Sequence, residues 1–148
     1  MDKNLIRKQS LTFLIMIIVG ILFNPMNILA FRIKDLYLSL TLLYGGLLMA
    51  SNMMWAHELI HYILYGHFNA YIFILGILLS IGISIYLLRN QFLVDDEQWL
   101  KRMISHHSTA LTTSLNIYNK TKNKKIKKLA KDIIDTQEDE IKIMKSLL

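Results

Sequence analysis

The sequence predicts an all-α membrane protein, with three transmembrane helices followed by a C-terminal antiparallel αα-hairpin. Three blocks of nearly continuous apolar residues precede Arg89, and each is close to the roughly 20 residues that cross a bilayer as a helix. After Arg89 the chain becomes rich in charge, and its apolar residues recur every three or four positions, which is typical of amphipathic helices. A single proline and the absence of cysteine exclude Pro-rich disordered chains, disulfide frameworks and thiolate metal sites.

The first membrane helix is predicted over residues 11–31, after a basic N-terminal tail at residues 1–10. Pro25 interrupts the apolar run, but a membrane helix tolerates proline and kinks there. A cleaved signal peptide is the alternative for this block, because basic residues precede a short apolar run and Ala30 could end it. Ile28 disfavours that alternative, since a small residue is preferred three positions from the cleavage site.

The second and third membrane helices are predicted over residues 36–56 and 70–88. Within the third helix, Gly76, Ser80 and Ser84 recur every four residues and form one face of small side chains. Small residues let helix backbones approach closely in a membrane. We therefore expect the third helix to pack tightly, either within the chain or against a second copy.

The distribution of basic residues bears on orientation. Three spans place the turn at residues 32–35 on the same side as everything after Arg89, and place the loop at residues 57–69 on the side of the N-terminus. The side that carries the hairpin has slightly more Lys and Arg near the spans, so the positive-inside rule favours a cytoplasmic hairpin by a small margin. The sequence thus predicts an integral, multi-pass membrane protein whose orientation stays open.

A pair of amphipathic helices is predicted over residues 94–148. Apolar side chains follow helical spacing over residues 100–118 and again over residues 126–148. The polar stretch at residues 119–123 separates the two helices, and a short polar loop of this kind is typical of an antiparallel hairpin. Three acidic residues begin the first helix, where negative charge suits the helix dipole.

Two polar residues, His107 and Gln137, stand in the otherwise apolar faces of this hairpin. Helix geometry puts them at the same level when the chain is folded about the turn. Since a buried polar side chain needs a partner, we expect each to reach the neighbourhood of the other. A hydrogen-bonded pair that fixes the hairpin register would need no ligand, and a metal site is the alternative.

The same hairpin contains a run of motif residues: Met103-Ile104-Ser105-His106-His107, followed by Leu129-Ala130, Ile133-Ile134, Gln137, Glu140-Ile141 and Met144. This run resembles the family of the domain of unknown function 305, a CopM-like, ferritin-like helical family. The resemblance extends from Arg89 to Met144 and implies the membrane-bound branch, in which three spans precede one hairpin. It also implies copper, which some members bind. Thr113 stands where many soluble members carry a second methionine, and Ser105 replaces the usual proline; the first departure weakens the copper inference.

Two groups of side chains could hold copper or a similar soft cation, which in a chain without thiols must bind thioether and imidazole groups. The hairpin group consists of Met103, His106, His107, Gln137, Glu140 and Met144. The second group, at the membrane edge, consists of Met53, His57 and His61, spaced four residues apart on one helix face. Methionines that fill gaps between helices and histidines at the membrane interface are the alternative reading.

The second group also contains His57-Glu58-x-x-His61, the pattern of zinc hydrolases in which two histidines bind Zn²⁺ and the glutamate acts as general base. A catalytic zinc needs a third protein ligand, for which His67 is near in sequence. The third predicted span contains no carboxylate, which disfavours an intramembrane protease.

The leading functional hypothesis is therefore a non-enzymatic membrane protein that binds copper or a similar metal. A structural or assembly membrane protein without ligand is the alternative, and an intramembrane zinc hydrolase is less favoured. The partners we expect are the lipid bilayer and a second copy of the chain, because one hairpin cannot build a four-helix core alone. A lysine-rich turn follows Tyr118, but the aromatic residues of a nucleic-acid surface are missing around it, so nucleic acid is not expected.

Overall fold

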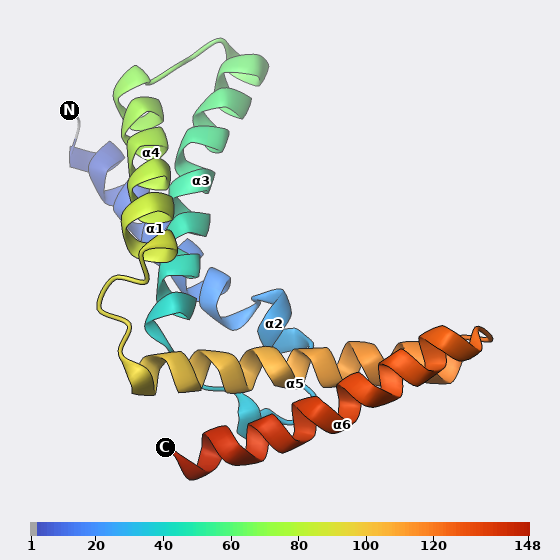
Figure 1. The fold of residues 1–148 in the computed structure, drawn as a ribbon. Coiled ribbons are helices and arrows are strands. Elements are labelled where there is room, and N and C mark those ends of the chain that lie inside the picture. Colours follow the sequence, from blue (N-terminus) through green and yellow to red (C-terminus); the bar gives the residue numbers. More distant parts are fainter. Residues whose placement is uncertain (1–2) are drawn as a thin grey trace. The chain divides into compact units, whose positions relative to one another are not determined.

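The computed structural model describes residues 3–148, which form helices and turns and no strand (Figure 1). The chain divides into two compact units. The first consists of residues 3–22 and 40–93, and the second consists of residues 23–39 and 94–148. The second unit therefore combines the predicted hairpin with residues 23–39, which include the end of the first predicted span and the start of the second. We call residues 23–39 the connecting segment.

Three helices form the first unit. They are α1 (Lys3–Leu22), α3 (Leu40–Tyr65) and α4 (Ala70–Gly82), and the π-helical turn Ile83–Arg89 extends α4. Both α1 and α4 pack on α3. The Asn69 side chain begins α4 by accepting a hydrogen bond from the Ile72 backbone N–H, which satisfies a donor that the helix itself leaves unpaired. Helix α3 is thus the centre of this unit.

Glycines bring these helices into close contact. A Cβ atom added to Gly20 of α1 would lie 3.0 Å from the Cα atom of Gly46 in α3. A Cβ atom added to Gly76 of α4 would lie 2.9 Å from the backbone nitrogen of Trp55 in α3. The packing therefore depends on small residues, as is common between membrane helices. The small-residue face predicted around Gly76 does contact another helix of the same chain.

Two helical segments among the described residues, Lys3–Ile28 and Ala70–Arg89, are long and apolar enough to cross a membrane. Helix α3 contains the span predicted over residues 36–56 but does not reach the same hydropathy, because Ser51, Asn52 and His57 interrupt its apolar residues. The structure thus supports two candidate spans, and the third span stays a prediction.

The boundaries of the first two helices differ from the prediction. The span predicted over residues 11–31 overlaps the candidate span Lys3–Ile28, but the helix is interrupted within it: α1 ends at Leu22, and the short helix α2 (Pro25–Ile28) follows. The Asn24 side chain accepts a hydrogen bond from the Met26 N–H and starts α2. The predicted tail at residues 1–10 is helical from Lys3 onward, and its residues 1–2 lie outside the described residues. Helix α3 begins at Leu40 instead of residue 36.

The hairpin of the second unit consists of α5 (Asp96–Lys120) and α6 (Lys124–Ser146), joined by three residues. Each helix begins with a side-chain cap: Asp95 accepts a hydrogen bond from the Gln98 N–H, and Asn123 accepts from the Lys125 and Ile126 N–H groups. The buried core between the helices consists of Leu100, Ile104, Leu111, Ile134, Ile141 and Met144. The helical spacing in the sequence predicts this pair of helices.

The connecting segment, residues 23–39, packs against the hairpin, and the sequence analysis did not foresee this contact. Its Asp35 is fully buried in the 3-10 turn Ile33–Asp35. The Asp35 carboxylate accepts hydrogen bonds from the Ser108 hydroxyl at 2.8 Å and from the Lys145 ammonium at 2.5 Å. Its backbone carbonyl accepts from the Ser105 hydroxyl at 2.9 Å. A buried charge is thus paired and hydrogen-bonded, which is what makes its burial tolerable.

Further polar contacts fix the connecting segment along the two helices. The Ser108 hydroxyl accepts from the Phe31 N–H at 2.9 Å, and the Thr109 hydroxyl donates to the Met26 carbonyl at 2.9 Å. Arg32 forms an ion pair with Glu138 of α6 at 2.5 Å. Because these contacts reach both helices, the connecting segment covers one flank of the hairpin.

We expect Asp35→Ala to release the connecting segment and to reduce its local stability by about 1–3 kcal/mol, since a buried hydroxyl and an ammonium lose their partner. Hydrogen–deuterium exchange of residues 23–39 and of α5 measures this change. Asp139→Ala is the matched control, because it removes an ion pair with Lys142 in which both side chains are 72% exposed. Equal effects of the two substitutions would contradict the anchoring role of Asp35.

Candidate functional site

His107 occupies the middle of α5, where its side chain is largely buried. Its Nδ1 atom lies 2.8 Å from the Met103 carbonyl oxygen, and its Nε2 atom lies 2.8 Å from a carboxylate oxygen of Glu140 in α6. A carbonyl only accepts hydrogen bonds, so Nδ1 carries a proton and donates it to Met103. The ring is therefore held with Nε2 directed at Glu140.

This arrangement fixes the number of protons shared by His107 and Glu140. With Nδ1 protonated, the hydrogen bond between Nε2 and Glu140 needs one more proton, held on the imidazole or on the carboxyl group. Gln137 Nε2 lies 3.5 Å from the same carboxylate oxygen and can donate to it. The structure thus brings together His107, Gln137 and Glu140, with Glu140 bridging the two residues that the sequence analysis placed level.

The other predicted donors of the hairpin differ in their surroundings. Met144 is buried in the apolar core, and Met103 packs against the same core. His106 is exposed, with its ring centroid 6.0 Å from that of His107. Among residues 3–148, no group of three or more His, Asp or Glu side chains could hold a metal ion. The copper site that the resemblance implies, which includes methionines, therefore stays a prediction.

The second predicted group lies at the end of α3, in the first unit. The ring centroid of His61 lies 6.1 Å from that of His57 and 6.2 Å from that of His67. Met53, His57 and His61 line one cavity of about 560 Å³, which confirms that they share a helix face. His61 Nδ1 lies 3.2 Å from the His67 carbonyl oxygen, so one ring nitrogen is already bound within the protein.

Glu58, the general base of the zinc-hydrolase pattern, has a structural partner. It is buried, and its carboxylate accepts a hydrogen bond from the Asn69 backbone N–H at 3.1 Å. It therefore ties the end of α3 to the loop that leads into α4. This contact accounts for the burial of Glu58 without a catalytic step.

One feature of the hairpin escaped the sequence analysis. A second stripe at alternating three- and four-residue spacing runs along each helix, on the flank away from the connecting segment. We call these two stripes the open face: Trp99, Met103, His106, Ala110, Thr113 and Ile117 of α5, and Ile126, Leu129, Ile133, Thr136, Glu140, Ile143 and Leu147 of α6. Several apolar members are well exposed, with Leu129 and Ile143 each 59% exposed. Both stripes are present in the sequence, but they are hard to distinguish there, because their residues are next to core residues that recur at the same spacing.

The electrostatic environment of His106 differs from that of free histidine. Partial burial lowers its pKa below the ordinary value of 6.5, and electrostatic interaction with His107 and Arg102 lowers this pKa further. Arg102 itself lies in a partly buried place, where its guanidinium group donates to the Met26 sulfur at 2.6 Å. His106 on the open face is therefore biased toward the neutral form.

Comparison with known proteins gives two similarities. Residues 89–148 match the family described as domain of unknown function (DUF305). The chain is also 40% identical over 126 residues to the uncharacterized protein L153 of Acanthamoeba polyphaga mimivirus, an alignment that covers 84% of this chain and 81% of the relative. No solved structure shows significant similarity to the chain.

The lowered pKa of His106 predicts how stability changes with pH. As the pH falls through 6.5, the unfolded chain binds a proton at this residue before the folded chain does, so acid favours unfolding. His106→Gln removes this difference in proton binding between the unfolded and folded chains. We therefore expect the variant to lose less stability than the wild type when the pH is lowered from about 7.5 to 5.5. Thermal unfolding followed by circular dichroism measures both proteins. Parallel losses in the two proteins would show that His106 makes no such contribution.

Proposed function

From the premise that the chain belongs to the DUF305 family, we propose that it is a non-enzymatic membrane protein that acts through association of its helical hairpin with a second copy. The observation that carries this proposal is the open face. Alternating three- and four-residue spacing on both helices is the pattern by which helices pack along a common seam. Exposed Leu129, Ile143 and Leu147 leave that seam without a partner inside the second unit.

A second copy is the partner that the hairpin itself suggests. Two helices with one flank covered by the connecting segment offer half of a four-helix bundle, and a symmetric pair of hairpins completes it. In a pair whose two-fold axis runs parallel to the helices, α5 of each copy can pack antiparallel on α6 of the other in the register of the hairpin, and His106 of one copy then comes level with Glu140 of its partner. A hydrogen-bond donor then faces a carboxylate at the centre of the interface, in addition to the apolar contacts.

The contacts of the connecting segment also support the predicted number of spans. Residues 23–39 and the hairpin pack together, so they lie on the same side of any membrane. The intervening chain, α3 and α4, must therefore cross the membrane an even number of times. If Ala70–Arg89 spans the membrane, α3 spans it too, and this parity favours a multi-pass arrangement in which α1, α3 and α4 each cross the membrane.

Association can be tested with single cysteines, because the natural chain contains none. We expect Leu129→Cys, on the open face, to yield covalent dimers with a short bismaleimide in reconstituted vesicles. Lys142→Cys is the matched control on the same helix, exposed but outside the open face. Adding Ile143→Glu to Leu129→Cys places a carboxylate in the interface and should weaken association at least about tenfold. Equal crosslinking of both cysteines, or none at Leu129→Cys, would contradict the proposal.

A metal-binding hairpin is the second candidate function, and the observation that favours it is the contact of His107 with Met103. A backbone carbonyl that holds Nδ1–H is the support commonly found behind a histidine whose Nε2 binds a metal. A cation could then replace the proton between Nε2 and Glu140. One chain supplies these two donors, so a second copy would have to supply the others.

Metal analysis separates the two candidates. If the hairpin binds copper, wild-type protein titrated with copper and then desalted should retain it, and His107→Gln should lose most of it. His67→Gln is the matched control, because it removes a histidine of the first unit. Loss of copper on desalting in all three proteins would contradict the second candidate. The crosslinking result tests association independently of this outcome.

A further inference from the structure

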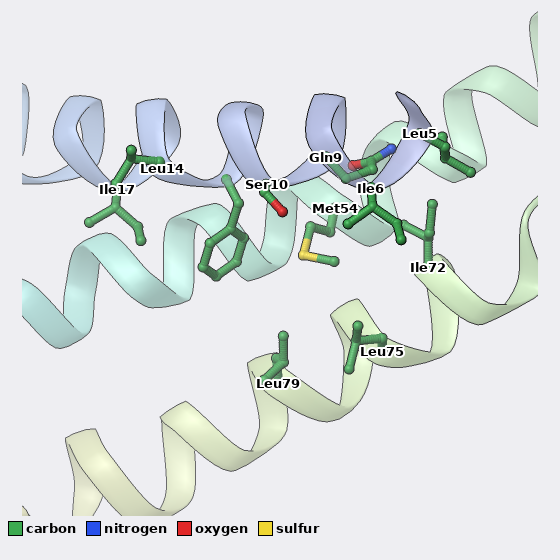
Figure 2. A pocket seen from close by; sticks show the side chains of 11 residues that line it. Leu5, Ile6, Gln9, Ser10, Leu14, Ile17, Met54, Ile72, Leu75 and Leu79 are labelled. Atoms are coloured by element: carbon green, nitrogen blue, oxygen red, sulfur yellow. The ribbon is translucent and has the colours of Figure 1, made fainter. Parts of the chain in front are cut away.

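A cavity of about 460 Å³ lies in the first unit, between α1 and α4 and over α3 (Figure 2). Ile6 from α1, Met54 from α3, and Leu75 and Leu79 from α4 point into the same space. Nine of the eleven residues that line it are apolar. Its volume falls in the range of roughly 300–1,000 Å³ that is usual for small-molecule sites.

The lining and the location of this cavity favour an apolar occupant that comes from the membrane. Gln9 and Ser10 are the polar residues of the lining, so a buried water would find few hydrogen-bond partners across most of the space. The walls formed by α1 and α4 belong to the two candidate membrane spans. An acyl chain is the apolar group that a bilayer supplies at this depth.

Basic and imidazole groups lie beside the cavity, on the other side of Gln9. The adjoining cavity of about 560 Å³ shares Leu5, Gln9, Phe13 and Met54 with the first one, and it is also lined by Lys8, His57 and His61. Within residues 3–22 and 40–93, Glu58 is the single carboxylate, and the Asn69 N–H already occupies one of its oxygens. Glu58 lines a neighbouring cavity together with His57 and His61. The three basic residues of the first turns of α1, Lys3, Arg7 and Lys8, outnumber this one carboxylate, so this end of the first unit has an excess of positive charge as well as N–H donors.

We propose that an anionic phospholipid binds in the first unit, with one acyl chain in the apolar cavity and its phosphate group beside Lys8, His57 and His61. The ammonium group pairs with the phosphate as a point charge, and the imidazole N–H groups donate hydrogen bonds to its oxygens. This site assigns His57 and His61 a role that needs neither a metal ion nor the catalytic pattern around Glu58.

The test uses full-length protein in mild detergent, exposed to phosphatidylglycerol or to phosphatidylcholine with the same acyl chains. Native mass spectrometry counts the lipid molecules that stay bound. We expect preferential retention of phosphatidylglycerol, and we expect Lys8→Gln to weaken it about fivefold, the effect of one basic residue near a membrane surface. Arg89→Gln is the matched control, because Arg89 ends the π-helical turn and lines neither cavity.

Two further variants test the position of the acyl chain. Leu75→Trp fills the cavity, and Leu79→Phe fills it more gently in case the first variant does not fold, which circular dichroism checks. We expect either folded variant to retain less of both lipids. Equal retention of the two lipids by the wild type, or Lys8→Gln behaving as Arg89→Gln does, would overturn the headgroup site. Unchanged retention in a folded cavity variant would overturn the acyl-chain site.

Discussion

The buried carboxylate of Asp35 is the constraint on which the second unit depends. A buried charge needs hydrogen-bond partners, and here the Ser108 hydroxyl of α5 and the Lys145 ammonium of α6 both donate to the Asp35 carboxylate. Those contacts hold residues 23–39 on one flank and leave the other flank exposed. The buried anchor at Asp35, together with the contacts of Phe31, Arg32 and Met26, therefore divides the hairpin into a covered flank and the open face on which association is proposed.

His107 shows how a sequence motif can suggest a metal site although the hydrogen-bonding groups of its histidine are already paired within the protein. A histidine and a glutamate brought within 2.8 Å across two helices are suitable ligands, but they are also suitable partners for each other. The proton that they share removes the cost of leaving either group unpaired. Soft ligands would have to come from methionines, and Met144 is already committed to the apolar core. The hairpin register is thus fixed whether or not an ion binds.

The hairpin could be predicted from the sequence because its information is local: apolar spacing marks both helices, and capping residues such as Asp95 and Asn123 mark their starts. Helix geometry alone predicted that His107 lies level with Gln137, but the direct partner of His107 is Glu140, three residues further along α6. The position of Asp35 could not be predicted, since a lone carboxylate in a short polar linker looks solvated until a partner 110 residues away is known. Asn24 and Pro25 indicate the helix break after Leu22, but the sequence did not decide between a break and a kink, because membrane helices tolerate proline.

The anchor at Asp35 also sets an order of events during synthesis. Residues 23–39 leave the ribosome long before Ser108 and Lys145 exist, so the Asp35 carboxylate has to stay hydrated while α3 and α4 are made. The second unit can close only after α6 has been translated. A chain truncated before α6 would keep Ser108 but lack Lys145, so the buried Asp35 carboxylate would lose its cationic partner.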